Sequence, residues 1–222
     1  MNIFLLRHFE SEKNIADTLS SRDDDESLTF HGRQACAAFS THYKSFCVKN
    51  NIVLHRVHCA DSMRASETAQ TIAETMNTPI VRHAAFRSTS PGNLMGKSMK
   101  ELKTLAPFFY HNFYLYKKGL LNLYYFDDNW IAAEKETRKD FERRVVADFT
   151  EITNRREDTL IVSHRASITA ILLHVARLMG IYSHDFYGCI TLGVGKISWL
   201  QYKDHAWTIK CLDEDVREMD HA

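Results

Sequence analysis

Short apolar runs and longer amphipathic stretches alternate along most of this chain. The apolar runs that predict strands are residues 3–6, 56–60, 79–86 and 159–163. The stretches that predict helices are residues 30–50, 62–76, 138–155 and 166–179. Strands that alternate with helices predict an α/β fold, a three-layer sandwich in which helices cover both faces of a mostly parallel sheet.

The carboxyl-terminal part of the chain predicts a hairpin. Residues 196–202 and 207–212 alternate as strands do, and they flank a turn at residues 203–206. Gly180 is suited to end the helix that precedes this hairpin. Neither repeats nor linkers interrupt the pattern, so we expect a single domain over residues 1–222.

One segment, at about residues 98–135, departs from this alternation because it is dense in aromatic residues. Its aromatic residues include Phe108, Phe109, Tyr110, Phe113, Tyr114, Tyr116, Tyr124, Tyr125, Phe126 and Trp130. We expect a helical insertion packed over the sheet. The other interpretation is a lid whose rings line a substrate pocket, and different rings could serve each purpose. Exposed rings of such a lid could also form a homodimer contact.

Composition and charge narrow the classes of function. The 222 residues are 45% hydrophobic and 25% charged, as in ordinary globular proteins. The 28 basic and 28 acidic residues give a formal net charge of zero. No global field therefore favours nucleic acid or a charged partner, and any anion must be bound by a local cluster. The aromatic segment has rings but few cations, which also argues against a nucleic-acid partner.

The five cysteines are odd in number and have no CxxC spacing, which indicates reduced thiols rather than a disulfide framework. The amino terminus lacks the pattern of a secretory signal. No apolar run approaches the roughly 18 residues that a membrane span requires. We therefore expect a cytoplasmic protein without a membrane partner.

Candidate chemistry gathers where the first strand ends. The apolar run 3–6 stops abruptly at Arg7 and His8, and Asn14 follows within the same loop. The strand at 159–163 likewise ends at His164. In open α/β sheets the ligand crevice forms at the carboxyl ends of the strands, so this arrangement predicts an anion site there.

These residues resemble the signature of the histidine phosphatase superfamily, also called the phosphoglycerate-mutase-like family. Its Arg-His-Gly-Glu-Ser-x-x-Asn pattern is matched by residues 7–14, with Phe9 in place of the glycine. Segments similar to its other motifs follow in the family's order: Leu28 to Ala35, Ala60 to Ala69, Glu136 to Val145, and Ile161 to His164. The resemblance spans about residues 1–212.

The resemblance implies that His8 is phosphorylated and later discharged to water, with His164 donating to a phosphoryl oxygen. Arg7 and Arg64 supply guanidinium forks that suit paired phosphate oxygens. An imidazole attacks only through an unprotonated nitrogen, and backbone carbonyls at the strand end could fix the required tautomer. We assign these four residues as catalytic.

We expect neither a metal nor a cofactor, because no histidine pair has a metal-ligand spacing. The other histidines, such as His58 and His83, are assigned no chemistry.

The substrate-binding candidates are Asn14, Ser163, Arg165, Arg87 and Arg22. Arg165 and Phe9 stand where the family has glycine. Their bulk could shape the site for a substrate with a second anionic group, or both side chains could point into packing or solvent. The acids at residues 23–26 are expected in a solvated loop, because they would repel an anionic ligand.

One departure concerns the family's general acid. The family's Leu-Arg-Glu pattern is matched by Phe86, Arg87 and Ser88, so serine stands where the acid is expected. The aspartate that other members carry after the second histidine is also missing. Three accounts remain: another carboxylate moves in, the leaving group needs no proton, or catalysis is lost while binding remains. The carboxylates considered for the first account are Glu101, Asp127, Asp128 and Glu134.

The leading hypothesis is a metal-free phosphatase that acts on a small phosphorylated metabolite through His8. The alternative is a catalytically weakened module that binds a phospholigand or phosphoprotein. Mutase activity is disfavoured, because a mutase must retain its phosphohistidine long enough to rephosphorylate its product.

Overall fold

The computed structural model describes residues 1–16, 26–88, 92–117, 136–181 and 192–219. The strands in chain order are β1 (Asn2–Arg7), β2 (Arg56–Ala60), β3 (Ile80–His83), β4 (Thr159–Ser163), β5 (Ile197–Lys203) and β6 (Ala206–Glu214). The α-helices are α1 (Glu12–Ile15), α2 (Phe30–Lys49), α3 (Met63–Met76), α4 (Met99–Leu105), α5 (Pro107–Lys117), α6 (Arg138–Asn154) and α7 (Arg165–Leu178). Short 3-10 turns occupy Ala84–Phe86 and Gly92–Leu94.

The six strands form one sheet in the order β3-β2-β4-β1-β5-β6. The first four strands in that order are mutually parallel, and β5 and β6 are antiparallel additions at the β1 side. Residues 204 and 205 of the tight β5–β6 turn have positive φ angles. The mixed α/β fold and the carboxyl-terminal hairpin are thus confirmed.

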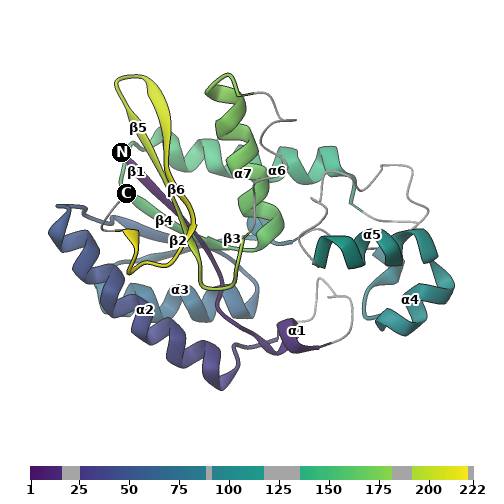
Figure 1. Ribbon diagram of the computed structural model, residues 1–222. Helices are drawn as coiled ribbons and strands as arrows, with labels where there is room; N and C mark the ends of the chain where they lie inside the picture. The colour runs from purple at the N-terminus through teal and green to yellow at the C-terminus, as the bar shows by residue number, and fades with distance from the viewer. Residues whose placement is uncertain (17–25, 89–91, 118–135, 182–191, 220–222) are drawn as a thin grey trace.

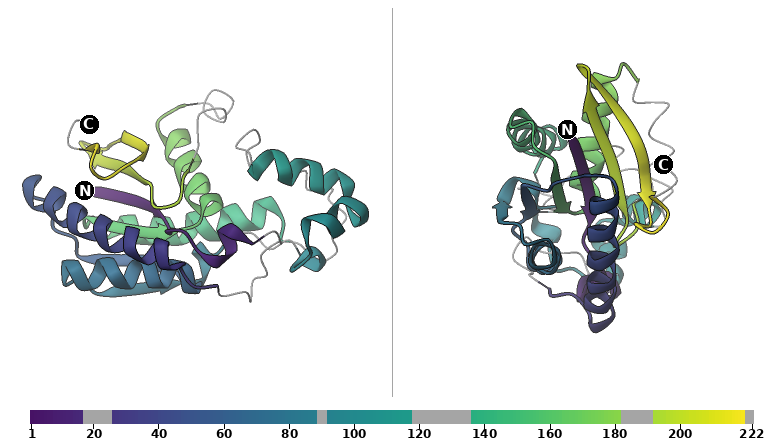
Figure 2. Two further views of the ribbon diagram at one scale, coloured as in Figure 1. Left: turned by 60° about the horizontal axis from the view of Figure 1, so that its bottom comes forward. Right: turned by 90° about the vertical axis from the view of Figure 1, so that its left-hand side faces the viewer.

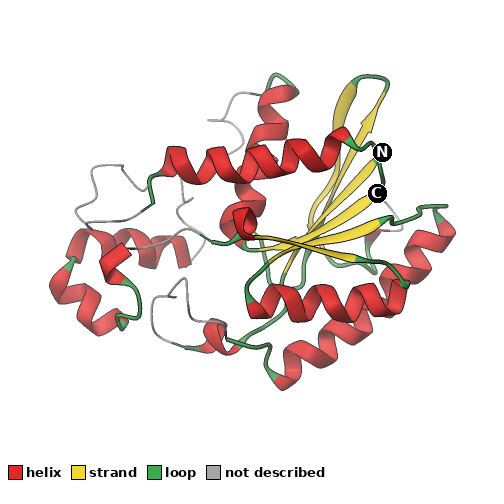
Figure 3. Ribbon diagram, turned by 180° about the vertical axis from the view of Figure 1, so that it is seen from behind, coloured by secondary structure: helices red, strands yellow, loops and turns green. Residues whose placement is uncertain are grey.

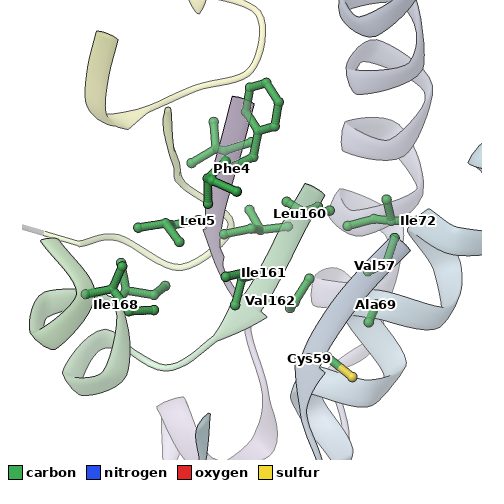
Figure 4. Packing of buried hydrophobic residues seen from close by; sticks show 14 of the residues in the cluster. Phe4, Leu5, Val57, Cys59, Ala69, Ile72, Leu160, Ile161, Val162 and Ile168 are labelled. Atoms are coloured by element: carbon green, nitrogen blue, oxygen red, sulfur yellow. The ribbon is translucent and has the colours of Figure 1, made fainter. Parts of the chain in front are cut away.

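Helices cover both faces of this sheet (Figure 1 and, from behind, Figure 3). On β1, the ring of Phe4 packs edge-on against Tyr43 of α2 at 5.4 Å between centroids. Leu5 points to the opposite face, toward Ile168 of α7 (Figure 4). This alternation places α2 and α3 on one face and α6 and α7 on the other, as the period of a strand buried on both faces requires.

Two glycines permit close approaches that hold the segment after β1 in place. A Cβ atom at Gly32 would lie 2.0 Å from the carbonyl oxygen of Glu10, so only glycine lets the first turn of α2 rest there. A Cβ atom at Gly195 would lie 2.4 Å from the ring of Phe9. Phe9 is 7% exposed and packs against Phe39 of α2, so its side chain belongs to the core.

The helices α4 and α5 form an arm that lies beyond the carboxyl ends of the parallel strands rather than over a face of the sheet (Figure 2). The arm has its own small cluster of Met99, Leu102 and Phe109. Phe108 and Tyr114 are exposed on it. The aromatic residues at 118–135 lie outside the described residues, so the lid interpretation remains a prediction.

Cys36, Cys47 and Cys59 are free thiols buried in the core. Burial raises the pKa of Cys36 and Cys47 to about 12 and that of Cys59 to about 11, which keeps these sulfurs protonated and unreactive at neutral pH. In the part of the chain that the structure describes, no helix is both long and apolar enough to cross a bilayer.

A chain of hydrogen bonds joins β2, the last residue of β3, and α6. His58 Nδ1 lies 2.8 Å from His83 Nε2, and His83 Nδ1 lies 2.9 Å from Asp148 Oδ2. Burial, with the neighbouring His83 and Arg56, lowers the pKa of His58 from 6.5 to about 3. An unfolded chain therefore takes up a proton at residue 58 well before the folded chain does.

We expect His58 to make the protein less stable in acid. Between pH 6.5 and about pH 3 the unfolded state binds the extra proton, so the free energy of unfolding falls as pH falls. The slope from one such group reaches about 1.4 kcal/mol per pH unit. Urea unfolding at pH 7.5, 6.0 and 5.0 should show a smaller loss for His58→Gln than for the wild type. The exposed His31→Gln is the control, and equal slopes in all three proteins would contradict the expectation.

Candidate active site

The carboxyl ends of β1 and β4 bring the two motif histidines together. Arg7 pairs with Ser163 in the parallel register, so His8 and His164 follow at equivalent positions of adjacent strands. The backbone N–H of His8 donates to the carbonyl of Ser163 at 3.0 Å. The two imidazole rings lie 5.1 Å apart between centroids, inclined by 64°.

The tautomer of His8 is set by the backbone. Its Nδ1 lies 2.7 Å from the carbonyl oxygen of Phe9, and because a carbonyl only accepts, Nδ1 carries the proton. Burial lowers the pKa of His8 well below 6.5, and the positive charges of Arg64 and Arg7 lower it further, against the opposite effect of the Phe9 carbonyl. Nε2 is therefore unprotonated at neutral pH, as a nucleophile requires.

His164 is buried beside His8 and is also held neutral. Burial is the main cause of its lowered pKa, followed by the charges of Arg64, His8, Arg7 and Arg87. Its Nε2 lies 2.9 Å from the hydroxyl of Ser62, the N-cap residue of α3. A serine hydroxyl can donate or accept, so the ring can present a proton on that side without a charge.

The two arginines come from different elements and reach the same place. Arg7 ends β1 and donates from Nη1 to the carbonyl of Leu192. Arg64 lies in the first turn of α3, and its side chain is only 7% exposed. The positive charges of both arginines lower the pKa of both imidazoles. A buried and a partly buried guanidinium that act on two neutral imidazoles form a local positive site suited to an oxyanion.

The loop after β3 brings a third arginine. Arg87 pairs with Asp61, and its charge acts on His164. Ser163, expected to bind substrate, instead donates its hydroxyl to the carbonyl of Phe86 at 2.7 Å. The hydroxyl of Ser167 donates to the same carbonyl at 2.9 Å. The hydrogen bonds from these two serines hold the loop after β3 and thereby position Arg87.

Of the other expected contacts, Asn14 is hydrogen-bonded within its own loop. Its side-chain oxygen accepts from the backbone N–H and the hydroxyl of Ser11, both at 2.9 Å, at the start of α1. Arg165 begins α7 and is partly exposed. Arg22 lies outside the described residues. The site that the structure brings together is thus formed by His8, His164, Arg7, Arg64 and Arg87.

One acid of the expected solvated loop faces the site instead. Glu26 Oε2 lies 3.2 Å from Arg64 Nη1. The expectation of a solvated position for Glu26 is therefore wrong. The reason is that the buried Arg64 supplies the opposite charge that the loop acids lack in solvent, an attraction that local sequence does not reveal.

The segment where the family's acid is expected is held by backbone contacts. Arg144 of α6 donates to the carbonyls of Ala85, Arg87 and Ser88 and forms a two-pronged pair with Glu136. Two residues of the α6 motif therefore shape the loop of Arg87.

Glu101, one proposed substitute acid, is exposed and accepts from the backbone N–H and hydroxyl of Ser98 at the start of α4. Asp127, Asp128 and Glu134 lie outside the described residues.

Fold and site together define an α/β protein with paired histidines and arginines at the carboxyl edge of its sheet. The profile of the histidine phosphatase superfamily (branch 1) matches residues 3–215. The chain therefore belongs to that superfamily. Among curated proteins, none matches the sequence significantly.

Solved structures share the fold at low sequence identity. The alpha-ribazole phosphatase from Shigella flexneri is 20% identical with a TM-score of 0.70, covering 97% of this chain and 97% of that chain. A mycobacterial glucosyl-3-phosphoglycerate phosphatase in complex with VO3 is 17% identical with a TM-score of 0.72, covering 96% and 98%. Bacillus stearothermophilus YhfR is 19% identical with a TM-score of 0.73, covering 94% of each chain. At these identities the likeness establishes the fold alone.

Three contributors to the site were missed by the sequence analysis. Ser62 was considered only as a helix cap, although it lies two residues before Arg64 at the end of β2. Thr68 accepts from the backbone N–H of Phe9 at 3.3 Å and donates to the carbonyl of Arg64 at 2.8 Å. These bonds tie α3 to the nucleophile loop, the segment after β1 that begins at His8. The position of Thr68 one helical turn after Arg64 was the available signal. Glu26 gave none.

Proposed function

We propose that this protein is a phosphatase that hydrolyses a small phosphorylated metabolite through a phosphohistidine on His8, without a metal. The observation that carries the proposal is the hydrogen bond from His8 Nδ1 to the Phe9 carbonyl in a buried, cationic setting. A neutral imidazole with a fixed tautomer is what nucleophilic attack on phosphorus needs.

The proposed reaction has two steps. His8 Nε2 forms a bond to phosphorus while the bond to the leaving oxygen breaks, and Arg7 and Arg64 hold the equatorial oxygens. His164, beside the nucleophile, donates to a phosphoryl oxygen as charge develops. Water then attacks the phosphohistidine, releasing inorganic phosphate and neutral His8. Pre-positioned donors of this kind commonly contribute on the order of a hundredfold or more each.

Several observations support hydrolysis of a small molecule. Two of the structural neighbours are named as phosphatases of alpha-ribazole and glucosyl-3-phosphoglycerate, both small molecules. Ser88 in place of the family's acid disfavours a mutase, which must return the phosphoryl group to its product. The buried thiols of the core fit a cytoplasmic setting.

A binding module is the second candidate, and the serine at position 88 is the observation that favours it. Such a module would keep the arginines and histidines that hold phosphate but would not form the phosphohistidine.

The experiment that separates the candidates is trapping with phosphorus-labelled acetyl phosphate, quenched in alkaline detergent. We expect stoichiometric label that is stable in alkali, labile in acid and absent from His8→Ala. The exposed His31→Ala should be labelled like the wild type. Failure of the wild type to take up label from an activated phosphate would favour the binding module.

A further inference from the structure

The two residues that follow Glu26 are hydrogen-bonded to two other parts of the site. The backbone N–H of Glu12 donates to the carbonyl of Ser27 at 3.1 Å, and Leu28 forms a β-bridge with Ser11. The N–H of Leu28 also donates to Glu67 of α3 at 2.8 Å. The residues that follow Glu26 are therefore tied both to the nucleophile loop and to the helix that carries Arg64.

The carboxylate of Glu26 reaches the phosphate-binding arginine from the solvent side. Its Oε2 lies 3.2 Å from Arg64 Nη1, and the two side chains are 24% and 7% exposed, respectively. The charge of Arg64 is in turn felt by both His8 and His164. Glu26 therefore pairs with the same guanidinium whose charge acts on the two histidines.

Other carboxylates around the site are engaged in holding its framework. Asp61 pairs with Arg87, Glu10 accepts from the hydroxyl of Thr29 at 2.8 Å, and Glu136 pairs with Arg144. Glu26, in contrast, pairs with Arg64. This contact distinguishes Glu26 from the other acids of the site.

We propose that Glu26 is the proton donor for the leaving oxygen, an inference that rests on the proposed phosphatase function. A dianionic phosphoryl group that binds Arg64 takes over the guanidinium from Glu26. The step requires a protonated Glu26, and the proton is taken from solvent as the substrate binds.

The proton balance closes over the cycle. As His8 Nε2 bonds to phosphorus, the electron pair of the breaking P–O bond stays on the leaving oxygen and takes the proton of Glu26. The carboxylate so formed then accepts a proton from the water that attacks the phosphohistidine. Hydrolysis thereby restores neutral His8 and protonated Glu26, and the products are an alcohol and inorganic phosphate.

The test compares the first-turnover phosphorylation of His8 by an alkyl and an aryl ester, followed by a rapid quench in alkaline detergent. The probes are glycerol 3-phosphate and p-nitrophenyl phosphate, and the variant is Glu26→Gln. An alkoxide needs a proton to leave, whereas a nitrophenoxide does not. We expect Glu26→Gln to slow labelling by the alkyl ester about 100-fold or more and labelling by the aryl ester only a few-fold. Glu12→Gln, an exposed acid of α1, should change neither rate.

The aryl ester serves as the internal control for folding and for the cradle. An equal loss with both esters would overturn the proposal, since it would indicate a structural role. An equal gain would overturn it as well, and would assign Glu26 as an anion that competes for Arg64. If the wild type takes up no label from either ester, the proposed phosphatase function itself fails. A labelled wild type with an unchanged ester ratio rejects Glu26 alone.

Discussion

Replacement of His8 by alanine is expected to lower kcat toward p-nitrophenyl phosphate by at least about a thousandfold. The variant keeps the arginines that hold phosphate but lacks the nitrogen that attacks phosphorus. In the described part of the chain, the neighbouring His164 cannot take over as the attacking group, because its Nε2 is directed toward Ser62. Steady-state assays of the variant and the wild type at saturating substrate measure the loss.

Two controls separate lost chemistry from lost structure. Inorganic phosphate should still bind to His8→Ala within about tenfold of the wild type, because Arg7 and Arg64 remain in place. Added imidazole should restore part of the activity by entering the space that the buried ring, 4% exposed, leaves behind. A variant that keeps more than a tenth of the wild-type kcat would contradict His8 as the nucleophile.

The convergence at the sheet edge could be predicted from the sequence because strand ends are local features. Arg7-His8 and Ser163-His164 each stop an apolar run, and parallel strands of one sheet expose such ends on the same side. The register of β1 against β4 then places the histidines in contact. The mostly parallel sheet was inferred from the alternation of strands with helices, a pattern that extends over whole segments of the chain.

Side-chain direction at single positions could not be predicted in the same way. Phe9 turns into the core because Gly195, far away in the chain, leaves room for its ring. Glu26 turns inward because Arg64 attracts it. Asn14 turns back because Ser11 offers two donors to its side-chain oxygen. Each direction depends on a partner that the local pattern does not specify.

Burial lowers the pKa of the two site histidines more than any single charged residue does. Desolvation is the largest cause of the lowered pKa of both His8 and His164, and the arginines add to it. The same cations that we propose to bind the phosphoryl oxygens therefore also keep His8, the proposed nucleophile, unprotonated. A bound phosphate would neutralise the arginines and would therefore oppose their lowering of the pKa of His8 and His164.

Replacement of Arg64 tests these two roles of the cation separately. We expect Arg64→Lys to lower kcat/KM by about 100-fold, because an ammonium keeps the charge but loses the planar fork that binds paired oxygens. The acidic limb of its pH–rate profile should stay near that of the wild type, because the charge beside His8 remains. Arg33→Lys is the matched control, an exposed arginine that also faces a glutamate, and it should change kcat/KM less than twofold.

Arg64→Met should lose both roles. Without the cation the pKa of His8 rises toward its usual value, so the acidic limb of the profile moves to higher pH in the methionine variant but not in the lysine variant. The test is measurement of kcat/KM for both variants between pH 4.5 and 8. The plateau value of kcat/KM reports the loss of the planar guanidinium fork, and the position of the acidic limb reports the loss of the charge. If the limb moved equally in both variants, the charge of Arg64 would not act on the nucleophile. If the plateau fell less than about threefold in both, Arg64 would not hold the phosphoryl group.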